Sequence, residues 1–446
     1  MGKSTKTRGD VSRLSGPKKS NVLASAGRKS PGGNAMDVDA VIFGGGATGL
    51  WLLDQLSLRS DRVLLLEAGR LGEGQTVASQ GIIHGGLKYT LHGLLTPAAR
   101  EIREMPDLWR QCLAGRRFPD LRSTRVRAEC CHLWRSDSLR SRLGMLGARV
   151  GLHVAPREIS AADRPEVLAA CPGPVARLEE QVICPASFIA DLSRQHRPRI
   201  LKIDADAGLQ FMIANSGSTP CIRIEHPPTG RQVEISARHI VLAAGAGNTV
   251  LRRKLGLPDD QMQKRPLHMV LLHGNLPVLN GHCVDGARTR VTIITDSDSR
   301  GRTVWQVGGQ LAEDGVNCDE QSLVRGARDE LLAVLPGVDF ADCEWAAYRV
   351  DRAERAIPRG GRPDAATVLA DGNILTVWPT KLALAPQAAQ MVAACLPRHD
   401  RNADRKSSFD PEELADWPRP EVALPPWEMP RTWYRLDRSL RTNRAA

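Results

Sequence analysis

The sequence predicts an α/β fold in which an antiparallel, β-rich domain is inserted into a domain built on a parallel sheet. Two observations support this prediction. A complete strand-helix-strand unit with a glycine-rich turn occupies residues 38–67. Strands also alternate with helical patterns towards both ends, whereas strand follows strand between turns in residues 208–244 and 267–311. Alternating strands and helices are typical of parallel sheets, and consecutive strands are typical of antiparallel ones.

The glycine-rich turn makes the strand-helix-strand unit Rossmann-like. An apolar strand, residues 38–43, runs into Gly44-Gly45-Gly46-Ala47-Thr48-Gly49, and a helix continues to residue 58. Gly44 allows the tight turn, Gly46 lets a pyrophosphate lie against the backbone, and Gly49 lets the helix pack close to the sheet. The N–H groups at the helix start, at Ala47 and Thr48, then face the phosphates.

Glu67 completes this unit. It follows the second strand, residues 63–66, at the distance from the turn where a nucleotide fold places its acidic residue. A carboxylate there accepts hydrogen bonds from both hydroxyls of the adenosine ribose and repels a 2′-phosphate. The unit therefore predicts a dinucleotide without that phosphate, and the structural alternative is an ordinary strand-helix-strand turn.

Hydrophobic spacing assigns the remaining elements. Helices are expected at 97–115, 321–335 and 382–395, and Pro106 either interrupts the first or marks its start. Strands are expected at 209–214, 221–225, 233–236, 239–244, 291–295, 303–310, 343–350 and 374–378. From residue 399 the chain is rich in Pro, Arg and Trp. We expect Trp417, Trp427 and Trp433 to dock this irregular tail on the folded body, and a partner-binding motif is the alternative.

Positive charge is concentrated in an amino-terminal tail. The 446 residues carry a net charge of +11, and residues 1–35 hold eight Lys or Arg and one Asp, which leaves +4 for the rest. The tail, taken as residues 1–36, is rich in Ser, Gly and Lys, so we expect it to be disordered. Because the body is not strongly basic, charge gives little support to a nucleic-acid partner.

Composition also bears on the compartment. No stretch approaches the roughly twenty apolar residues of a membrane-spanning helix, and the tail lacks the apolar segment of a secretory signal. The ten cysteines are scattered without a C-x-x-C pair, and His132, His153, His268 and His282 are dispersed, so we interpret them as ordinary residues and expect no metal. We expect a cytoplasmic protein with reduced thiols, for which peripheral membrane contact stays open.

A second motif follows the Rossmann-like unit. Residues 74–89 read GQTVASQGIIHGGLKY, which resembles the flavin-contacting loop of the D-amino-acid oxidase-like FAD-dependent oxidoreductases. Within that superfamily the loop is most similar to the glycerol-3-phosphate dehydrogenase and 2-hydroxyglutarate dehydrogenase branches. Residues 241–247, 345–349 and 372–386 resemble, in order, the family's second FAD-binding strand and turn, its substrate-side Gly-x-Arg strand, and its closing strand and helix.

Two features depart from the family pattern. The loop before the last helix usually carries several glycines near the flavin, but here it reads Trp378-Pro379-Thr380-Lys381. The phosphate-dehydrogenase branch has a long carboxy-terminal helical domain, and nothing similar follows residue 398. The second departure argues against a strict glycerol-3-phosphate assignment.

The resemblance spans residues 37–398 and implies how the domains divide. It implies an FAD-binding domain built from residues 37–95, 185–256 and 345–398, a substrate domain built from 96–184 and 257–344, and a carboxy-terminal tail of residues 399–446. It also implies FAD as the cofactor. The expected FAD contacts are Gly44, Gly46, Ala47, Thr48, Gly49, Glu67, Thr76, Ser79, His84, Gly85, Gly86, Ala244, Gly245, Thr380, Lys381 and Leu382.

His84 is the leading catalytic candidate. The resemblance places its glycine-flanked loop beside the flavin ring, and the ordinary pKa of histidine lies near working pH, so the side chain can accept the proton of an alcohol or amine. Two other roles stay open, a hydrogen bond to the cofactor and a covalent link to the flavin. Lys88 and Tyr89 either line the same pocket or pack within the loop.

Arg349 is the candidate clamp for an anionic substrate. A guanidinium binds a carboxylate or phosphate through two parallel hydrogen bonds, and the resemblance places an arginine of this strand over the flavin. The structural alternative is a salt bridge to Asp351 or Glu354. Lys381 either polarises the flavin or faces solvent.

Together these observations predict an FAD-dependent oxidoreductase. We expect it to oxidise a CH–OH or CH–NH bond of a small anionic substrate, with hydride transfer to flavin N5 and electrons passed to oxygen, a quinone or a carrier. The His-Gly-Gly loop slightly favours 2-hydroxy acids or polyol phosphates over amino acids. Two alternatives remain: a non-catalytic FAD-binding subunit of a larger oxidoreductase, which the bulky loop 378–381 favours, and a flavin-fold protein that acts on nucleic acid through its basic tail.

Overall fold

The computed structural model divides the chain into two units, Met1–Asn34 and Ala35–Ala446. It describes residues 36–60, 62–85, 102–135, 157–212, 220–286, 288–363, 365–397 and 411–436, all within the second unit. The predicted tail before Met36, together with Gly86, Lys88, Tyr89 and His153, lies outside the described residues.

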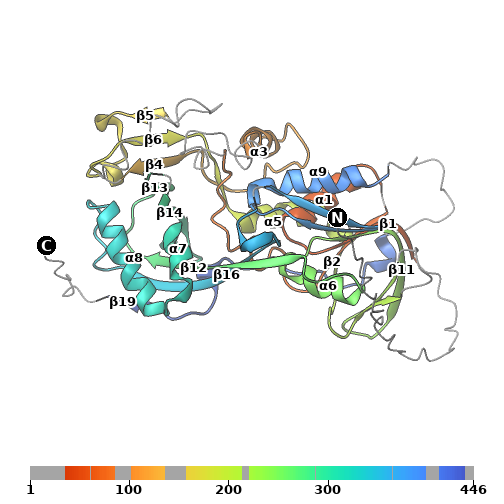
Figure 1. Ribbon diagram of the computed structural model, residues 1–446. Helices are drawn as coiled ribbons and strands as arrows, with labels where there is room; N and C mark the ends of the chain where they lie inside the picture. The colour runs from red at the N-terminus through yellow and green to blue at the C-terminus, as the bar shows by residue number, and fades with distance from the viewer. Residues whose placement is uncertain are drawn as a thin grey trace, which may run out of the picture. The chain divides into compact units, whose positions relative to one another are not determined.

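The first sheet is built around the predicted strand-helix-strand unit (Figure 1). Its strand order is β17-β18-β11-β1-β2-β8, and the last five of these strands are parallel. β17 runs antiparallel at the edge, and β10 and β9 extend antiparallel from β11. The strands are β1 (Met36–Phe43), β2 (Val63–Glu67), β8 (Ile200–Lys202), β9 (Leu209–Met212), β10 (Cys221–Glu225), β11 (Gln232–Leu242), β17 (Thr367–Asp371) and β18 (Ile374–Trp378).

Both faces of this sheet are covered, which explains why its central strands are almost wholly apolar. On β1, Ala40 and Ile42 pack with helices on one face, while Val41 and Phe43 pack on the other. Figure 1 shows α1 and α9 side by side on the first face. The helices are α1 (Ala47–Ser57), α3 (Met105–Leu113), α5 (Pro185–Gln195) and α9 (Ala385–Cys395) on the first face, and α6 (Asn248–Lys254) on the second.

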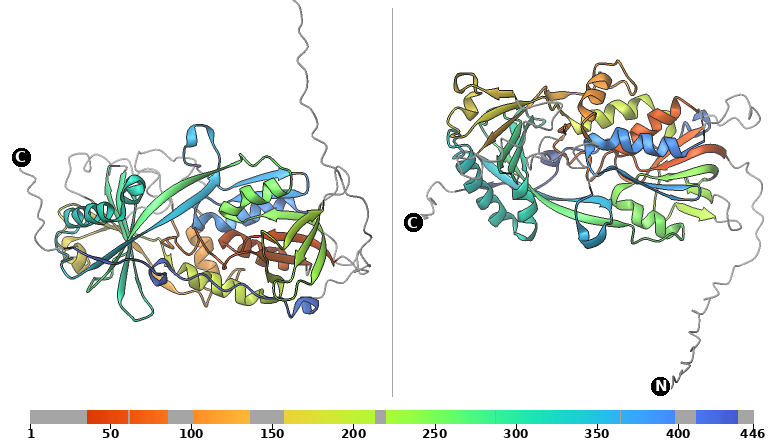
Figure 2. Two further views of the ribbon diagram at one scale, coloured as in Figure 1. Left: turned by 90° about the horizontal axis from the view of Figure 1, so that it is seen from below. Right: turned by 45° about the horizontal axis from the view of Figure 1, so that its top comes forward.

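The second sheet is largely antiparallel and has the order β19-β16-β12-β15-β14-β13-β4-β6-β5, with a parallel pairing only between β13 and β4. Its long pair, β12 and β16, can be followed in Figure 2 as two extended strands that run towards the first sheet. The strands are β4 (Cys131–Arg135), β5 (Arg157–Ile159), β6 (Val175–Leu178), β12 (Met262–His273), β13 (Gly281–Asp285), β14 (Arg288–Ser297), β15 (Thr303–Gly308), β16 (Glu344–Arg355) and β19 (Tyr434–Arg435).

Helix α8 (Glu320–Val334) closes the core of this second sheet. Its apolar positions, including Leu323 and Leu331, pack with Trp134, Trp305 and Trp345, which are buried. Asp319 caps the helix by accepting a hydrogen bond from the backbone N–H of Ser322. Short helix α7 (Gln310–Asp314) follows β15, and a small separate sheet pairs β3 (Val126–Ala128) with β7 (Val182–Ile183).

The predicted α/β fold with an inserted antiparallel region is confirmed, with local differences. Pro106 lies in the first turn of α3, so it marks the helix start. The strands expected at 233–236 and 239–244 are one continuous strand, β11, because its whole length pairs with β1 or β10. β16 belongs to the second sheet, so the predicted boundary between 344 and 345 falls inside a strand of that sheet.

The carboxy-terminal segment, residues 411–436, contacts both sheets. Trp417 is buried on the second face of the first sheet and donates from Nε1 to the carbonyl of Lys202 at 2.7 Å. Further along, Trp427 is buried and Trp433 stacks on His273 of β12 with ring centroids 3.8 Å apart. The expectation that these tryptophans dock the tail is confirmed. None of the described helices is long and apolar enough to cross a membrane.

Replacing Trp417 with Ala should lower the free energy of unfolding by about 3–5 kcal/mol, because it opens a cavity beneath the first sheet. The measurement is urea unfolding followed by circular dichroism. Trp417→Phe keeps most of the buried area and loses only the hydrogen bond to Lys202, so it should cost less. Met429→Ala, at an exposed position of the same segment, is the control and should change stability by less than about 0.5 kcal/mol. An effect of Trp417→Ala as small as the control would show that the segment contributes little to the fold.

Candidate active site

The turn after β1 is shaped by contacts of backbone with backbone. Gly44 has a φ of +106°, and a Cβ there would lie 2.5 Å from Cα of Ala244. A Cβ at Gly49 would lie 1.9 Å from the carbonyl oxygen of Gly44. The fold therefore excludes a side chain at either position. At Gly44 the reason is that the turn after β11 packs against the turn after β1.

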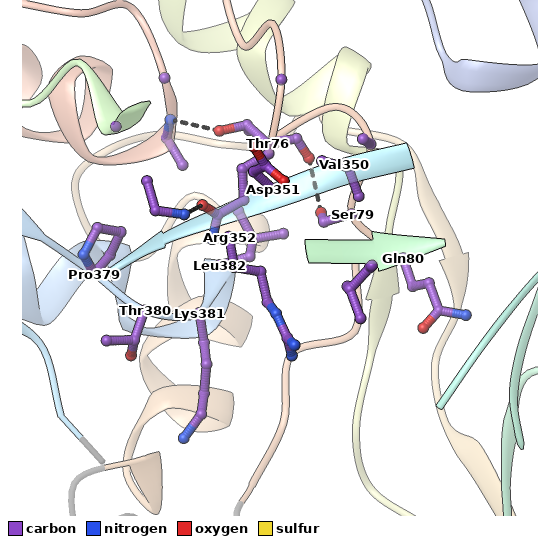
Figure 3. A pocket seen from close by; sticks show the side chains of 18 of the residues that line it. Thr76, Ser79, Gln80, Val350, Asp351, Arg352, Pro379, Thr380, Lys381 and Leu382 are labelled. Carbon is purple, nitrogen blue, oxygen red and sulfur yellow. Dashed lines mark hydrogen bonds between the residues drawn. The ribbon is translucent and has the colours of Figure 1, made fainter. Parts of the chain in front are cut away.

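Gly46 differs, because it faces open space. It is the N-cap of α1, and a Cβ there would meet only the Thr76 hydroxyl, at 3.3 Å. The same hydroxyl accepts a hydrogen bond from the backbone N–H of Ala47, drawn dashed in Figure 3. The hydroxyl of Thr48 is buried without a hydrogen-bond partner among the described residues. A helix start without a capping side chain at Gly46 and with an unsatisfied hydroxyl at Thr48 suits a phosphate group.

Glu67 lies at the end of β2, next to this helix start. Its two carboxylate oxygens accept hydrogen bonds from the backbone N–H groups of Gly45 and Gly69, each at 2.6 Å. Burial raises the pKa of the Glu67 carboxyl, and these two hydrogen bonds oppose the rise. The carboxylate is thus fixed in position beside the turn.

A cavity of about 1010 Å³ collects nearly all of the predicted site residues. Segments from both sheets line it, among them the loop after β2, the strand β16 and the loop before α9 (Figure 3). The predicted residues on its wall are Gly44, Gly46, Ala47, Thr48, Glu67, Thr76, Ser79, His84, Ala244, Gly245, Arg349, Thr380, Lys381 and Leu382. Gly49 and Gly85 do not line the cavity, and Gly86 lies outside the described residues.

In the loop 378–381, one residue has the left-handed backbone conformation that usually requires glycine. Thr380 has a φ of +64°, which a β-branched residue adopts at a cost of about 1–3 kcal/mol. Its hydroxyl is buried and without a hydrogen-bond partner among the described residues. Thr380 therefore has a backbone conformation typical of glycine, and it adds a hydroxyl to the cavity wall.

His84 is positioned by antiparallel pairing of its loop with residues 180–183. Ile82 bridges Val182, and the N–H of Ile83 donates to the carbonyl of Gln181 at 2.8 Å. This register sets His84 opposite Glu180, and Nδ1 of His84 lies 3.3 Å from Oε2 of that carboxylate. The N–H of Gly85 donates to Oε1 of the same carboxylate at 2.7 Å.

Arg349 lies on the cavity wall, and its side chain donates hydrogen bonds to backbone carbonyls. The guanidinium donates to the carbonyls of Val316 and Cys318 at 2.7 and 3.0 Å. The alternative of a salt bridge to Asp351 or Glu354 is wrong, because those carboxylates pair with Lys264 and Arg265 instead. The two carbonyls hold the planar group in one orientation at the cavity.

Sequence analysis did not identify the residues that attach the loop after β2, which resembles a flavin-contacting loop, to the second sheet. The carbonyl of Ala78 accepts hydrogen bonds from Gln306 Nε2 at 2.8 Å and from the Tyr348 hydroxyl at 2.9 Å. Gln80 donates from Nε2 to the carbonyls of Thr292 and Gln306. Burial raises the pKa of the Tyr348 hydroxyl, so it stays a proton donor. Gln80 and Tyr348 stood inside recognised motifs without being singled out, and nothing in the local sequence singles out Gln306.

His282, one of the histidines dispersed along the sequence, lies close to the predicted site residue His84 in the structure. His282 on β13 comes together with His84 and Glu180, so that one ligand-capable atom of each lies within 4.8 Å of the others. These three residues are far apart in the sequence, and no spacing rule links them.

Comparison with known proteins agrees with this geometry. Residues 39–393 match the model of the FAD-dependent oxidoreductase family called DAO. A probable FAD-dependent oxidoreductase of Pseudomonas aeruginosa, PA4991, is 39% identical over 408 residues, which are 89% of this chain and 98% of the relative. The crystal structure of PA4991 superposes with a TM-score of 0.72 at 34% identity and covers 89% of this chain and 99% of its own.

Two more distant structures share the fold. Glycine oxidase from Geobacillus kaustophilus has a TM-score of 0.55 at 16% identity and covers 83% of this chain and 98% of its own. L-amino acid deaminase from Proteus vulgaris has a TM-score of 0.56 at 16% identity, with coverage of 85% and 94%.

A cavity built on a Rossmann-like turn and closed by an antiparallel sheet defines a flavin-dependent oxidoreductase. The chain belongs to the DAO family of FAD-dependent oxidoreductases. The described residues fit FAD, because the start of α1 and the unsatisfied Thr48 hydroxyl suit the diphosphate and Glu67 suits the ribose. These relatives support the family, and they do not support placement near the glycerol-3-phosphate or 2-hydroxyglutarate dehydrogenases.

Gly46→Val should eliminate FAD while leaving the fold intact, because the new side chain enters the cavity at the diphosphate position. The measurement is the flavin absorbance of the purified protein after incubation with excess FAD, with circular dichroism as the check on folding. Gly49→Val is the matched comparison, and it should unfold the protein because its Cβ meets the Gly44 carbonyl. Full FAD occupancy in folded Gly46→Val would remove this turn from the cofactor site.

Proposed function

We propose that the protein oxidises a C–H bond next to a hydroxyl or amino group in a small anionic substrate. The observation that carries the proposal is His84, a proton-accepting side chain held by Glu180 on the wall of the cavity that the FAD-binding residues line. When bound, FAD supplies the acceptor for the hydride. The protein supplies binding, orientation and control of the proton.

His84 is proposed as the group that takes the proton of the hydroxyl or amine. If Glu180 accepts the N–H at Nδ1, the acceptor lone pair of the imidazole is at Nε2, where a proton can be received. The N–H of Gly85 fixes the same carboxylate from the other side. The pair therefore sets the orientation of the ring before the substrate enters.

Arg349 is proposed as the group that binds the substrate anion. Its bonds to Val316 and Cys318 use one N–H on each terminal nitrogen, and a guanidinium has five donors in all. The remaining donors serve a carboxylate or phosphate at the cavity, and the side chain needs little reordering to do so. The substrate class is thus a 2-hydroxy acid, a polyol phosphate or an amino acid.

We also propose a reducing compartment, the cytoplasm, because all ten cysteines are free thiols. Burial raises the pKa of the Cys112 and Cys283 thiols to about 12, so neither is reactive at neutral pH. These two thiols thus act as packing groups.

The test of the function is anaerobic mixing of the FAD-loaded protein with panels of 2-hydroxy acids, polyol phosphates and amino acids. At least one panel should bleach the oxidised flavin absorbance, and the panel that does so names the substrate class. His84→Asn should retain FAD and slow this bleaching by at least about 100-fold, the usual effect of a lost proton acceptor. No bleaching of the wild-type protein by any compound would favour a catalytically silent subunit.

Arg349→Ala should raise the KM for the bleaching substrate by a factor of ten or more, from the loss of about 1.5–3 kcal/mol in a charged hydrogen bond. Arg355→Ala is the control, since Arg355 lies on the same strand but contacts Gln261 and is not on the cavity wall. An unchanged KM in Arg349→Ala would leave this arginine without a part in substrate binding.

A further inference from the structure

Three side chains from separate parts of the chain converge where His84 lines the cavity. His84 lies on the loop after β2, Glu180 on the link between β6 and β7, and His282 on β13. Oε2 of Glu180 lies 3.3 Å from Nδ1 of His84 and 3.9 Å from Nε2 of His282. The exposed fractions of the three side chains are 16% for His84, 7% for Glu180 and 2% for His282.

Neighbouring groups orient the two most buried of these side chains. The N–H of Gly85 donates to Oε1 of Glu180 at 2.7 Å, which directs the other oxygen, Oε2, towards the two imidazoles. The Thr292 hydroxyl bonds to Nδ1 of His282 at 2.8 Å, which directs the other ring nitrogen, Nε2, towards Glu180. Hydrogen bonds of this kind, made by the atoms that are not ligands, orient side chains around metal ions.

We propose that His84, Glu180 and His282 bind a divalent transition-metal ion, for which Zn²⁺ is the fitting probe. Two imidazole nitrogens and one carboxylate oxygen form a ligand set of known catalytic zinc sites, which keep a further position for water or substrate. Imidazole favours zinc and its neighbours over Mg²⁺ and Ca²⁺, which prefer oxygen alone.

The spacing of the ligand atoms suits such an ion. Zinc bonds of 2.0–2.2 Å in a tetrahedron separate the ligand atoms by roughly 3.3–3.5 Å. The three atoms here lie within 4.8 Å of one another, and small rotations of the side chains close the difference. A single cation would also compensate the charge of the buried Glu180 carboxylate, which lowers the cost of burying that charge.

The proposed metal site depends on the proposed function in one respect only, the identity of the substrate that would reach the ion. Its open position would receive the hydroxyl, amine or carboxylate of the substrate. An imidazole bound to the ion through Nδ1 carries its proton on Nε2, so the proton transfer proposed for His84 would belong to the protein without the ion. Metal binding itself needs no substrate. A protein that bleaches with substrate but binds no metal therefore overturns this inference and leaves the proposed function standing.

The experiment uses the full FAD-loaded chain without an affinity tag, stripped with chelator and titrated with Zn²⁺ by calorimetry. The wild-type protein should bind one ion per chain. His282→Asn and Glu180→Gln should each weaken that binding at least tenfold, because the loss of a group that only orients a ligand already costs about 10–100-fold. His132→Asn is the matched control, because His132 lies on the neighbouring strand β4 and is not a member of the cluster. Flavin absorbance and circular dichroism report that each variant is loaded and folded.

A second measurement locates the ion directly. Zinc-edge anomalous diffraction from crystals of the loaded protein should place one peak between Glu180 and the two histidines. A zinc affinity that is the same in His282→Asn, Glu180→Gln and His132→Asn, or an anomalous peak elsewhere, would overturn the assignment. Mg²⁺ at the same concentration should give no heat, and equal binding of Mg²⁺ would contradict a site built on imidazole.

Discussion

The site depends on one constraint, the attachment of the loop after β2 to the second sheet. Residues 81–83 form backbone hydrogen bonds with 181–183, and the carbonyl of Ala78 accepts from both Gln306 and Tyr348. The loop begins at the nucleotide-binding sheet and is held by the antiparallel one. A flexible connection would leave His84 without a defined partner, whereas this one sets it opposite Glu180.

The two sheets make different contributions to the cavity. The first sheet contributes mainly backbone groups, namely a helix start and a turn in which close contacts require glycine. It also contributes the Glu67 carboxylate, which two backbone N–H groups hold in place. The second offers side chains that extend across from β16 and the strands beside it. This division is physically reasonable, because a phosphate is bound well by a helix terminus, whereas recognition of a small substrate requires particular side chains.

Thr380 shows how a departure from the family pattern is accommodated. A loop that usually relies on glycine here uses a threonine with a left-handed backbone, buried against the cavity. The strain is tolerated because β18 and α9 on either side are buried and hold the loop ends in place. The Thr380 hydroxyl and the neighbouring Lys381 make this part of the cavity wall polar.

The sequence by itself determined the Rossmann-like unit, its glycine-rich turn and most of the strands, because these depend on local periodicity and on glycines at fixed spacing. Even there it divided β11 in two, since a continuous strand is decided by its neighbours β1 and β10. Only the tertiary structure decided how Arg349 is held and that Glu180 and His282 meet His84. Those contacts join residues that are distant in the chain, and their side chains meet only because two sheets pack around one loop.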